Sequence, residues 1–348
     1  MSFQLPPDPR LTRRTRVSHR LSIGLTLALV AMLAYFAFVG YRGSEELVER
    51  PGGLADCRTP AAMGWAYEAI NYDVRADDEI ATLPDPEHCP ARNAAAGKMV
   101  VTDDGVRIAG WYIPAAGGIG PAGNTVVLIH GSQQTKSEML AWGSVLHDRF
   151  NLVAFDLRNH GQSSGNQTTQ GALEQLDLKA VLDWLMKAKK PAKVAVLGLS
   201  LGAATAVNEA TTDKRVNALV LGSMHATLAN AAQARLDTSG YPLSMAGAWA
   251  VLLGGLIRTG QDMSAVDPVQ AIARLGKRPV LVLAGGADRS VGRNDAQEIL
   301  DAARAAGINA QLQRCAAAGQ DQMLEACPAD TRGWVLGFLA HALATPLA

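Results

Sequence analysis

A series of short, uninterrupted apolar runs separated by longer amphipathic stretches constrains the fold of this chain more than any other feature. The runs lie at 125–129, 152–155, 194–197, 218–221 and 279–284, with a weaker one at 308–312. Strands that are buried on both faces have this appearance, and strands that alternate with helices build a mostly parallel sheet covered on both sides. The sequence therefore predicts an α/β fold.

Two flanking features complete this organisation. Segments 98–102 and 106–113 alternate in polarity and are joined by Asp103, Asp104 and Gly105, a hairpin signal. They bring the predicted sheet to eight strands within a domain over 98–348. Residues 222–265 interrupt the alternation, because a plain strand-to-helix connection needs far fewer residues. We expect a helical lid or cap there; a long packing helix is the alternative.

The N-terminal region predicts a membrane anchor. Residues 21–41 carry no charge and would form a helix of about 31 Å, close to the hydrocarbon thickness of a bilayer. Five arginines precede this run and three glutamates soon follow it. The positive-inside rule then places 1–20 in the cytoplasm, and 42–97 as an extracytoplasmic lead-in to the domain. A cleavable signal peptide is the alternative, although its apolar core would be shorter.

Composition limits the function classes. Lys and Arg number 32, as do Asp and Glu, so no basic surplus favours nucleic acid as a partner. The hydrophobic fraction of 48% excludes a disordered chain. In an oxidising compartment the four cysteines allow three pairings, of which we expect the local one, Cys57–Cys89 with Cys315–Cys327. Free buried thiols are the alternative. None of the four has metal-ligand spacing, so no metal is expected.

The most informative motif is Gly198-Leu-Ser200-Leu-Gly202, a G-x-S-x-G sequence directly after a buried apolar run. Helix-forming residues follow it, which is the strand–turn–helix context that a nucleophile elbow requires. Side chains at the two glycine positions would collide with neighbouring backbone. The turn holds the Ser200 hydroxyl clear of the backbone, so Ser200 is the candidate nucleophile.

With this motif the chain resembles the α/β-hydrolase family, and within it membrane-anchored, lid-bearing serine hydrolases of the esterase or peptidase type. The resemblance covers roughly residue 98 to the end. The stretch 128–132, which contains His130, resembles the family's His-Gly loop. The resemblance implies an oxyanion hole built from the backbone N–H groups of Leu201 and Ser132. It also implies that Asp288, after the run at 279–284, is the catalytic acid.

The third member of the family's catalytic triad is where the sequence departs. The position of the family histidine, after the last strand, is expected to hold Gln320. An amide cannot take a proton from serine and return it to a leaving group. Two histidines remain at this edge of the sheet. His130 is expected to pack under its loop, and His225 either substitutes as the base or braces the cap.

Two functions follow. The first is a membrane-anchored extracytoplasmic serine hydrolase that acts on a small-molecule ester or amide through an acyl-enzyme, with activity impaired by Gln320 and without a cofactor. The second is a catalytically inactive member of the fold that binds a ligand or partner, since a fold does not fix a function.

Overall fold

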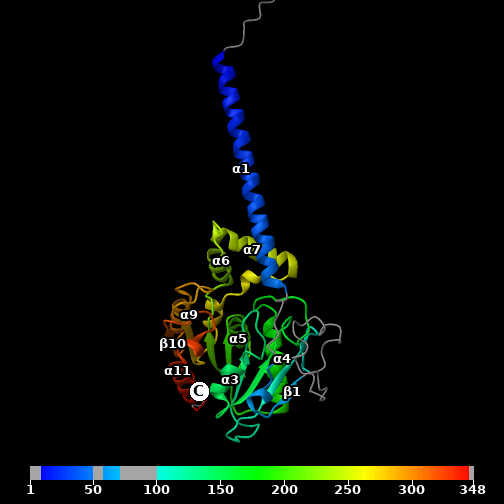
Figure 1. The fold of residues 1–348 in the computed structure, drawn as a ribbon, viewed down its shortest axis with the longest axis vertical. Coiled ribbons are helices and arrows are strands. Elements are labelled where there is room, and N and C mark those ends of the chain that lie inside the picture. Colours follow the sequence, from blue (N-terminus) through cyan, green and yellow to red (C-terminus); the bar gives the residue numbers. More distant parts are fainter. Residues whose placement is uncertain (1–8, 50–57, 71–99, 345–348) are drawn as a thin grey trace, which may run out of the picture.

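The computed structural model describes residues 9–49, 58–70 and 100–344, with side chains described from residue 19 onward. The predicted pair Cys57–Cys89 and most of the lead-in segment therefore lie outside the described residues. The described chain forms a layered α/β domain below a long N-terminal helix (Figure 1).

An eight-stranded sheet forms the centre of the domain. Six adjacent strands run parallel to one another, and the two antiparallel pairings lie together at one edge. This confirms the predicted fold class. In spatial order the strands are β1 (Glu68–Ile70), β4 (Gly110–Ile113), β6 (Asn151–Phe155), β5 (Thr125–Ile129), β7 (Val194–Leu199), β8 (Val216–Gly222), β9 (Val280–Gly285) and β10 (Ala310–Cys315).

The edge of the sheet differs from the prediction. The hairpin strands β2 (Val100–Val101) and β3 (Arg107–Ile108) pair only with each other, as a separate two-stranded sheet. The eighth strand of the main sheet is β1, which lies in the segment expected only as a lead-in. Just before it, η1 (Pro60–Met63) is one 3₁₀ turn that ends at Gly64, whose φ is 72°. A left-handed glycine at this position is a common helix terminator.

Helices cover both faces of the sheet, and alternate residues of each strand supply the two cores. Val127 packs with the helices of one face and Val126 with those of the other. The first face carries α4 (Glu174–Ala188), α5 (Leu201–Thr212), α8 (Pro268–Ile272) and α9 (Asp295–Ala305). The second carries α3 (Leu140–Leu146), α10 (Met323–Ala326) and α11 (Pro328–Ala344).

The segment between β8 and β9 rises above the carboxyl edge of the sheet (Figure 1). It contains α6 (Leu228–Thr238), α7 (Ser244–Thr259) and the 3₁₀ turn η2 (Met263–Ala265). We call residues 223–265 the cap. The N-terminal helix α1 (Pro9–Val48) packs against α7. By length and composition, α1 is able to cross a membrane.

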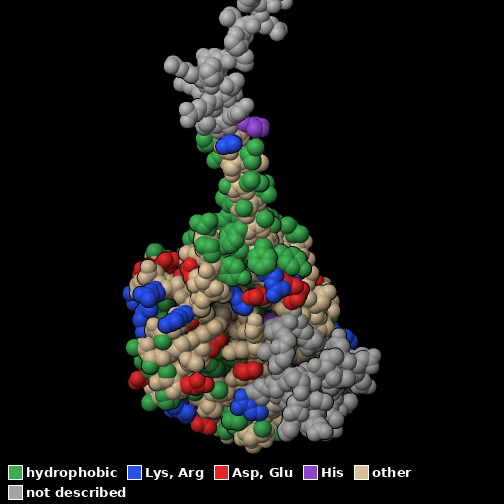
Figure 2. All heavy atoms as spheres, turned by 45° about the horizontal axis from the view of Figure 1, so that its top comes forward, with side chains coloured by type: hydrophobic (Ala, Val, Ile, Leu, Met, Phe, Trp, Pro, Cys, Tyr) green, Lys and Arg blue, Asp and Glu red, His purple; other side chains and the backbone are tan. Residues whose placement is uncertain are grey.

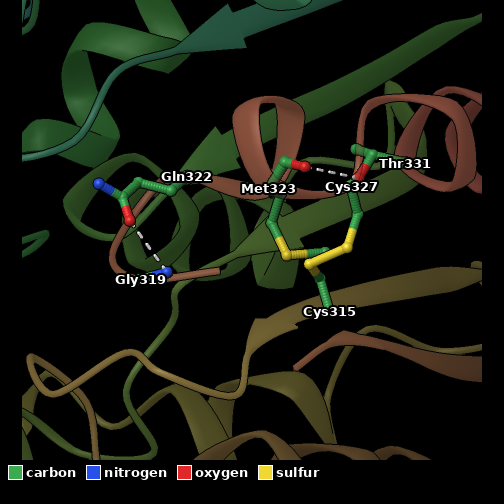
Figure 3. Close-up of a disulfide and its surroundings, with 6 residues drawn as sticks. All are labelled: Cys315, Gly319, Gln322, Met323, Cys327 and Thr331. Carbon is green, nitrogen blue, oxygen red and sulfur yellow. Dashed lines mark hydrogen bonds between the residues drawn. A yellow bond between two sulfur atoms is a disulfide. The ribbon is translucent and has the colours of Figure 1, made fainter. Parts of the chain in front are cut away.

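The predicted Cys315–Cys327 disulfide is present (Figure 3). The two Cα atoms lie 6.2 Å apart, and the bond ties the end of β10 to the turn between α10 and α11. Within the loop, the Gly319 N–H donates to Gln322 Oε1 at 3.1 Å, and from α11 the Thr331 hydroxyl donates to the Met323 carbonyl at 3.0 Å. The bond therefore fixes both ends of the loop that follows β10.

Replacing Cys315 and Cys327 together by alanine is expected to lower the free energy of unfolding by about 3 kcal/mol. The chain-entropy model gives this value for a loop of roughly this length. Urea unfolding of the full chain, followed by circular dichroism, measures the change. An unfolding midpoint equal to that of the unaltered protein would show that the bond does not stabilise the fold.

Candidate active site

Ser200 occupies a strained turn between β7 and α5. Its φ is 48° and its ψ is −110°, a conformation that costs a non-glycine residue about 1–3 kcal/mol. The flanking glycines explain how the turn fits: a Cβ on Gly198 would lie 2.4 Å from the Gly202 carbonyl oxygen, and one on Gly202 would lie 2.5 Å from the Ile129 carbonyl oxygen. The Ser200 side chain is partly exposed, and its hydroxyl hydrogen-bonds to no described residue.

Two backbone N–H groups are available near this serine. Leu201 begins α5, so its N–H has no acceptor within the helix. Ser132 follows β5 in a loop that touches the turn, since a Cβ on Gly131 would lie 3.5 Å from the Leu199 carbonyl oxygen. In the part of the chain that the structure describes, neither N–H group donates to a backbone carbonyl in a loop, turn or helix cap. Both are the donors expected of an oxyanion hole.

His130 holds this loop in place. The Leu157 N–H donates to its Nε2 at 3.0 Å, so the ring proton lies on Nδ1 and is donated to the Gly131 carbonyl at 2.8 Å. Burial lowers the pKa of His130 to about 3, which keeps the ring neutral. Both ring nitrogens therefore contact backbone groups, and none is left for a substrate.

The loop after β10 presents Asp321 to the site, one residue beyond Gln320, which the resemblance assigns to the position of the family histidine. Gln320 is exposed, and its side chain makes no hydrogen bond to Ser200 or Asp288. Asp321 has a φ of 56°, and its N–H donates to the Ser223 hydroxyl at 3.2 Å. Its Oδ2 would lie 3.2 Å from a Cβ on Gly131, so its carboxyl group faces the Ser132 loop.

Gln134, which sequence reasoning did not single out, connects Asp321 to this loop. Its Oε1 accepts from the Gly131 N–H at 2.8 Å, while its Nε2 reaches Asp321 Oδ2 at 3.4 Å. One side chain therefore fixes the loop that carries Ser132 and also the carboxyl group opposite it. The sequence carries no motif that would have marked this residue.

Two carboxyl groups come together at this edge. Asp288 follows β9, and its Oδ1 accepts hydrogen bonds from the N–H and hydroxyl of Ser290, at 2.9 and 2.6 Å. Its Oδ2 and Asp321 Oδ1 are both buried, and neither has a partner among the described residues. Burial, together with the charge of Asp288, raises the pKa of Asp321 to about 6.

His225 lies in the first part of the cap, and it is buried. Burial lowers its pKa to about 4, opposed by the negative charge of Asp295. Its Nε2 has no hydrogen-bond partner among the residues described, Ser200 included. The ring is therefore neutral near pH 7, and the charge that acts on it comes from α9 and not from Asp288.

The described ranges contain no group of three or more His, Cys, Asp or Glu residues that could hold a metal ion.

Comparisons with known proteins agree with this geometry. A family model of the alpha/beta hydrolase fold matches residues 124–239. An uncharacterised protein of Mycobacterium tuberculosis is 31% identical over 224 residues, which is 63% of this chain and 71% of that protein. The uncharacterised protein YfhR of Escherichia coli is 30% identical over 183 residues, which is 50% of this chain and 61% of YfhR.

Solved structures show the same fold. The Pyrococcus furiosus esterase Pf2001 superposes with a TM-score of 0.65 at 21% identity, over 85% of this chain and 98% of its own. A hydrolase from Pseudomonas aeruginosa gives a TM-score of 0.52 at 24% identity, over 71% of this chain and 99% of its own. Together with the family model and the 31% identical relative, the sheet order and the turn at Ser200 show that the chain belongs to the α/β-hydrolase fold family.

Proposed function

We propose that this protein is a membrane-anchored hydrolase that cleaves carboxylic esters or amides through an acyl-enzyme on Ser200. The observation that carries the proposal is the strained backbone of Ser200 at the start of α5. Strain of this kind persists only where the surrounding structure imposes it, and it gathers at active sites. In the proposed site, the N–H groups of Leu201 and Ser132 bind the oxyanion that forms when Ser200 attacks.

Asp321 is the group that we propose as general base in place of the family histidine. A base works best when its pKa lies near the operating pH. Burial raises the pKa of Asp321 to about 6, which is close to the ordinary value for imidazole, about 6.5. A desolvated carboxylate at this position therefore matches imidazole in basicity, although it differs in shape and charge.

The proposed reaction has two steps. Ser200 Oγ attacks the carbonyl carbon and its proton passes to Asp321, directly or through one water, while the Leu201 and Ser132 N–H groups bind the oxyanion. The protonated Asp321 then gives its proton to the leaving alcohol or amine, and the acyl-enzyme remains. In the second step Asp321 activates water, which releases the carboxylic acid and regenerates Ser200.

In this scheme Asp288 acts on Asp321 through its charge. In the usual triad the acid orients an imidazole and stabilises its positive form. Here its neighbour is a carboxyl group, so the Asp288 charge disfavours ionisation of Asp321 and raises its pKa. Asp288 is therefore a positioning residue that sets the basicity of Asp321.

The proposed orientation places residues 1–20 in the cytoplasm and the hydrolase domain outside. The five arginines before residue 21 support it, because cytoplasmic flanks of membrane spans are enriched in Arg and Lys. The Cys315–Cys327 disulfide also supports it, since such bonds persist in oxidising compartments.

The second candidate function is a catalytically inactive ligand- or partner-binding module. One observation favours it: within the described residues, no imidazole hydrogen-bonds to Ser200. Under this alternative the turn at Ser200 and the two N–H groups are inherited, and Asp321 binds a polar group of the ligand.

Labelling with a fluorophosphonate probe separates the two functions, because the probe reacts with activated serines. We expect the full chain to gain one covalent label, located at Ser200 by peptide mass spectrometry. Ser200→Ala should abolish it, and Ser144→Ala, which alters an exposed serine of α3, should leave the label on Ser200. A folded protein that stays unlabelled at Ser200 would favour the binding module.

A further inference from the structure

We propose that the cap helix α7 lies in the membrane that α1 spans, with one face of α7 in contact with lipid. The inference rests on the proposed anchoring and goes beyond it, because it places the cap itself at the depth of the bilayer. The carboxyl edge of the sheet, where Ser200 lies, would then face the membrane surface.

The length needed to cross a membrane determines where the span of α1 must end. The apolar run starts after Arg20, and crossing the hydrocarbon core takes about 20 residues, or about 30 Å of helix. The span must therefore include residues up to about Gly40. A span that stopped at Tyr35 would be a helix of only about 21 Å, which is too short to cross the hydrocarbon core.

Helix α7 packs on the end of this span. The Tyr35 hydroxyl donates to the Pro242 carbonyl at 2.5 Å. A Cβ on Gly40 would lie 2.7 Å from the Ala250 carbonyl oxygen, so the two helix backbones are nearly in contact. Since Tyr35 and Gly40 belong to the stretch that the span requires, the part of α7 beside them lies at the same depth.

One face of α7 is apolar and exposed. Met245, Trp249, Leu253 and Ile257 follow each other at intervals of four residues, and each is 51–76% exposed. The opposite side of the helix is buried against α6 and η2. Figure 2 shows hydrophobic side chains gathered around the base of α1 and continuing along it. A patch of this size rarely faces water in a monomeric protein.

The charges of the region lie at one end of the contact. Arg258, in the last turn of α7, is the only charged residue of that helix. Its guanidinium donates to the Ser44 hydroxyl at 2.9 Å and to the Tyr41 carbonyl at 3.2 Å, and it stacks on the Tyr41 ring at 4.6 Å. Arginine and tyrosine are residues that mark the membrane–water interface. The contacts thus place the N-terminal half of α7 deeper in the membrane than its C-terminal turn.

Lipid is the occupant that these observations favour, because the free face of α7 is continuous with exposed apolar residues of α1, such as Phe38. The test uses the full chain in vesicles of phosphatidylcholine and phosphatidylglycerol. Leu253→Cys and Met245→Cys report on α7, Leu29→Cys on the anchor, and Ile119→Cys on an exposed apolar position of the hydrolase domain. Each carries a bimane fluorophore, and the unaltered protein gives the labelling background.

We expect doxyl-labelled lipid to quench the fluorophores at positions 29, 245 and 253 but not at 119. Iodide should quench position 253 with a constant about tenfold lower than at 119, since ions are excluded from hydrocarbon. Lipid quenching should also be stronger at position 245 than in Ile257→Cys. Circular dichroism of each variant in the same vesicles checks that it is folded.

The outcomes separate the inference from the anchoring. Position 29 in lipid with position 253 open to iodide would overturn the inference and leave the anchor. Position 253 shielded from both quenchers would mean a protein partner or second copy and would also overturn it. Position 29 open to iodide would overturn the anchor, and the inference that rests on it would fall with it.

Discussion

Asparagine at position 321 is expected to lower kcat/KM for a short-chain nitrophenyl ester by about 10²- to 10⁴-fold, the usual contribution of a general base. Asp321→Asn keeps the size of the side chain and its reach toward Gln134, but an amide cannot accept the serine proton. Steady-state hydrolysis by the full chain measures the change. Fluorophosphonate labelling of Ser200 should slow in parallel, because it depends on the same proton transfer.

Gln320 supplies the matched control. Gln320→His and Gln320→Asn alter the neighbouring residue, whose side chain is exposed, and both should leave kcat/KM within about twofold, as is usual for surface changes away from a site. If Gln320→His instead raises hydrolysis by orders of magnitude, Gln320 occupies the family histidine position and Asp321 is not the base. If His225→Ala alone abolishes hydrolysis, the base is His225.

These two residues also show how far the sequence could predict the site. Spacing after the last strand points to Gln320, because it assumes that the loop has the family's backbone path. In the structure the left-handed turn falls at Asp321, and the Ser223 hydroxyl holds its N–H. Aspartate tolerates that conformation better than most residues, which was the available signal. A hydrogen bond from a residue 98 positions away is not visible in sequence.

The fold was easier to predict because its signals are local. The buried runs predicted β5 to β9, since a strand covered on both faces must be apolar throughout. The weaker run at 308–312 predicted the strand that became β10. The edge was harder: β1 is three residues long and pairs with β4 about forty residues later. The close packing of α1 on α7 depends on Gly40 and Gly254 meeting across 214 positions, and no periodicity reports it.

The second large effect is a pH dependence. We expect kcat/KM to rise with pH through about 6 and to level off above it, because burial raises the pKa of Asp321 to about 6 and only the ionised form accepts a proton. From the plateau down to pH 4 the rate should fall by about 100-fold, a factor of ten for each pH step below the pKa. Hydrolysis rates measured with a nitrophenyl ester across this range give the profile.

Asp288→Asn tests the cause of that profile. Removing the charge of Asp288 removes one of the influences that raise the pKa of Asp321. The rising limb of the pH profile should therefore move to lower pH, while the plateau value of kcat/KM remains. Asp330→Asn changes an exposed carboxyl group of α11 and should not move the limb. A limb that stays near pH 6 in Asp288→Asn but disappears in Asp321→Asn would assign the basicity of Asp321 to burial alone.

The same titration should appear in stability, without any need for activity. The pKa of Asp321 is raised above its unfolded value of 3.8, so the folded chain binds its proton more tightly than the unfolded chain does. The stability that Asp321 contributes is therefore present in its protonated form and is lost as pH rises from about 4 to about 6. Asp321→Asn removes this loss and should be the more stable protein at pH 8, by up to about 3 kcal/mol.

Urea unfolding of both proteins at pH 8 and at pH 4.5 measures the difference, which should shrink at the lower pH. An equal difference at the two pH values would mean that Asp321 does not titrate in this range, and the proposed base would then lack the property on which it rests.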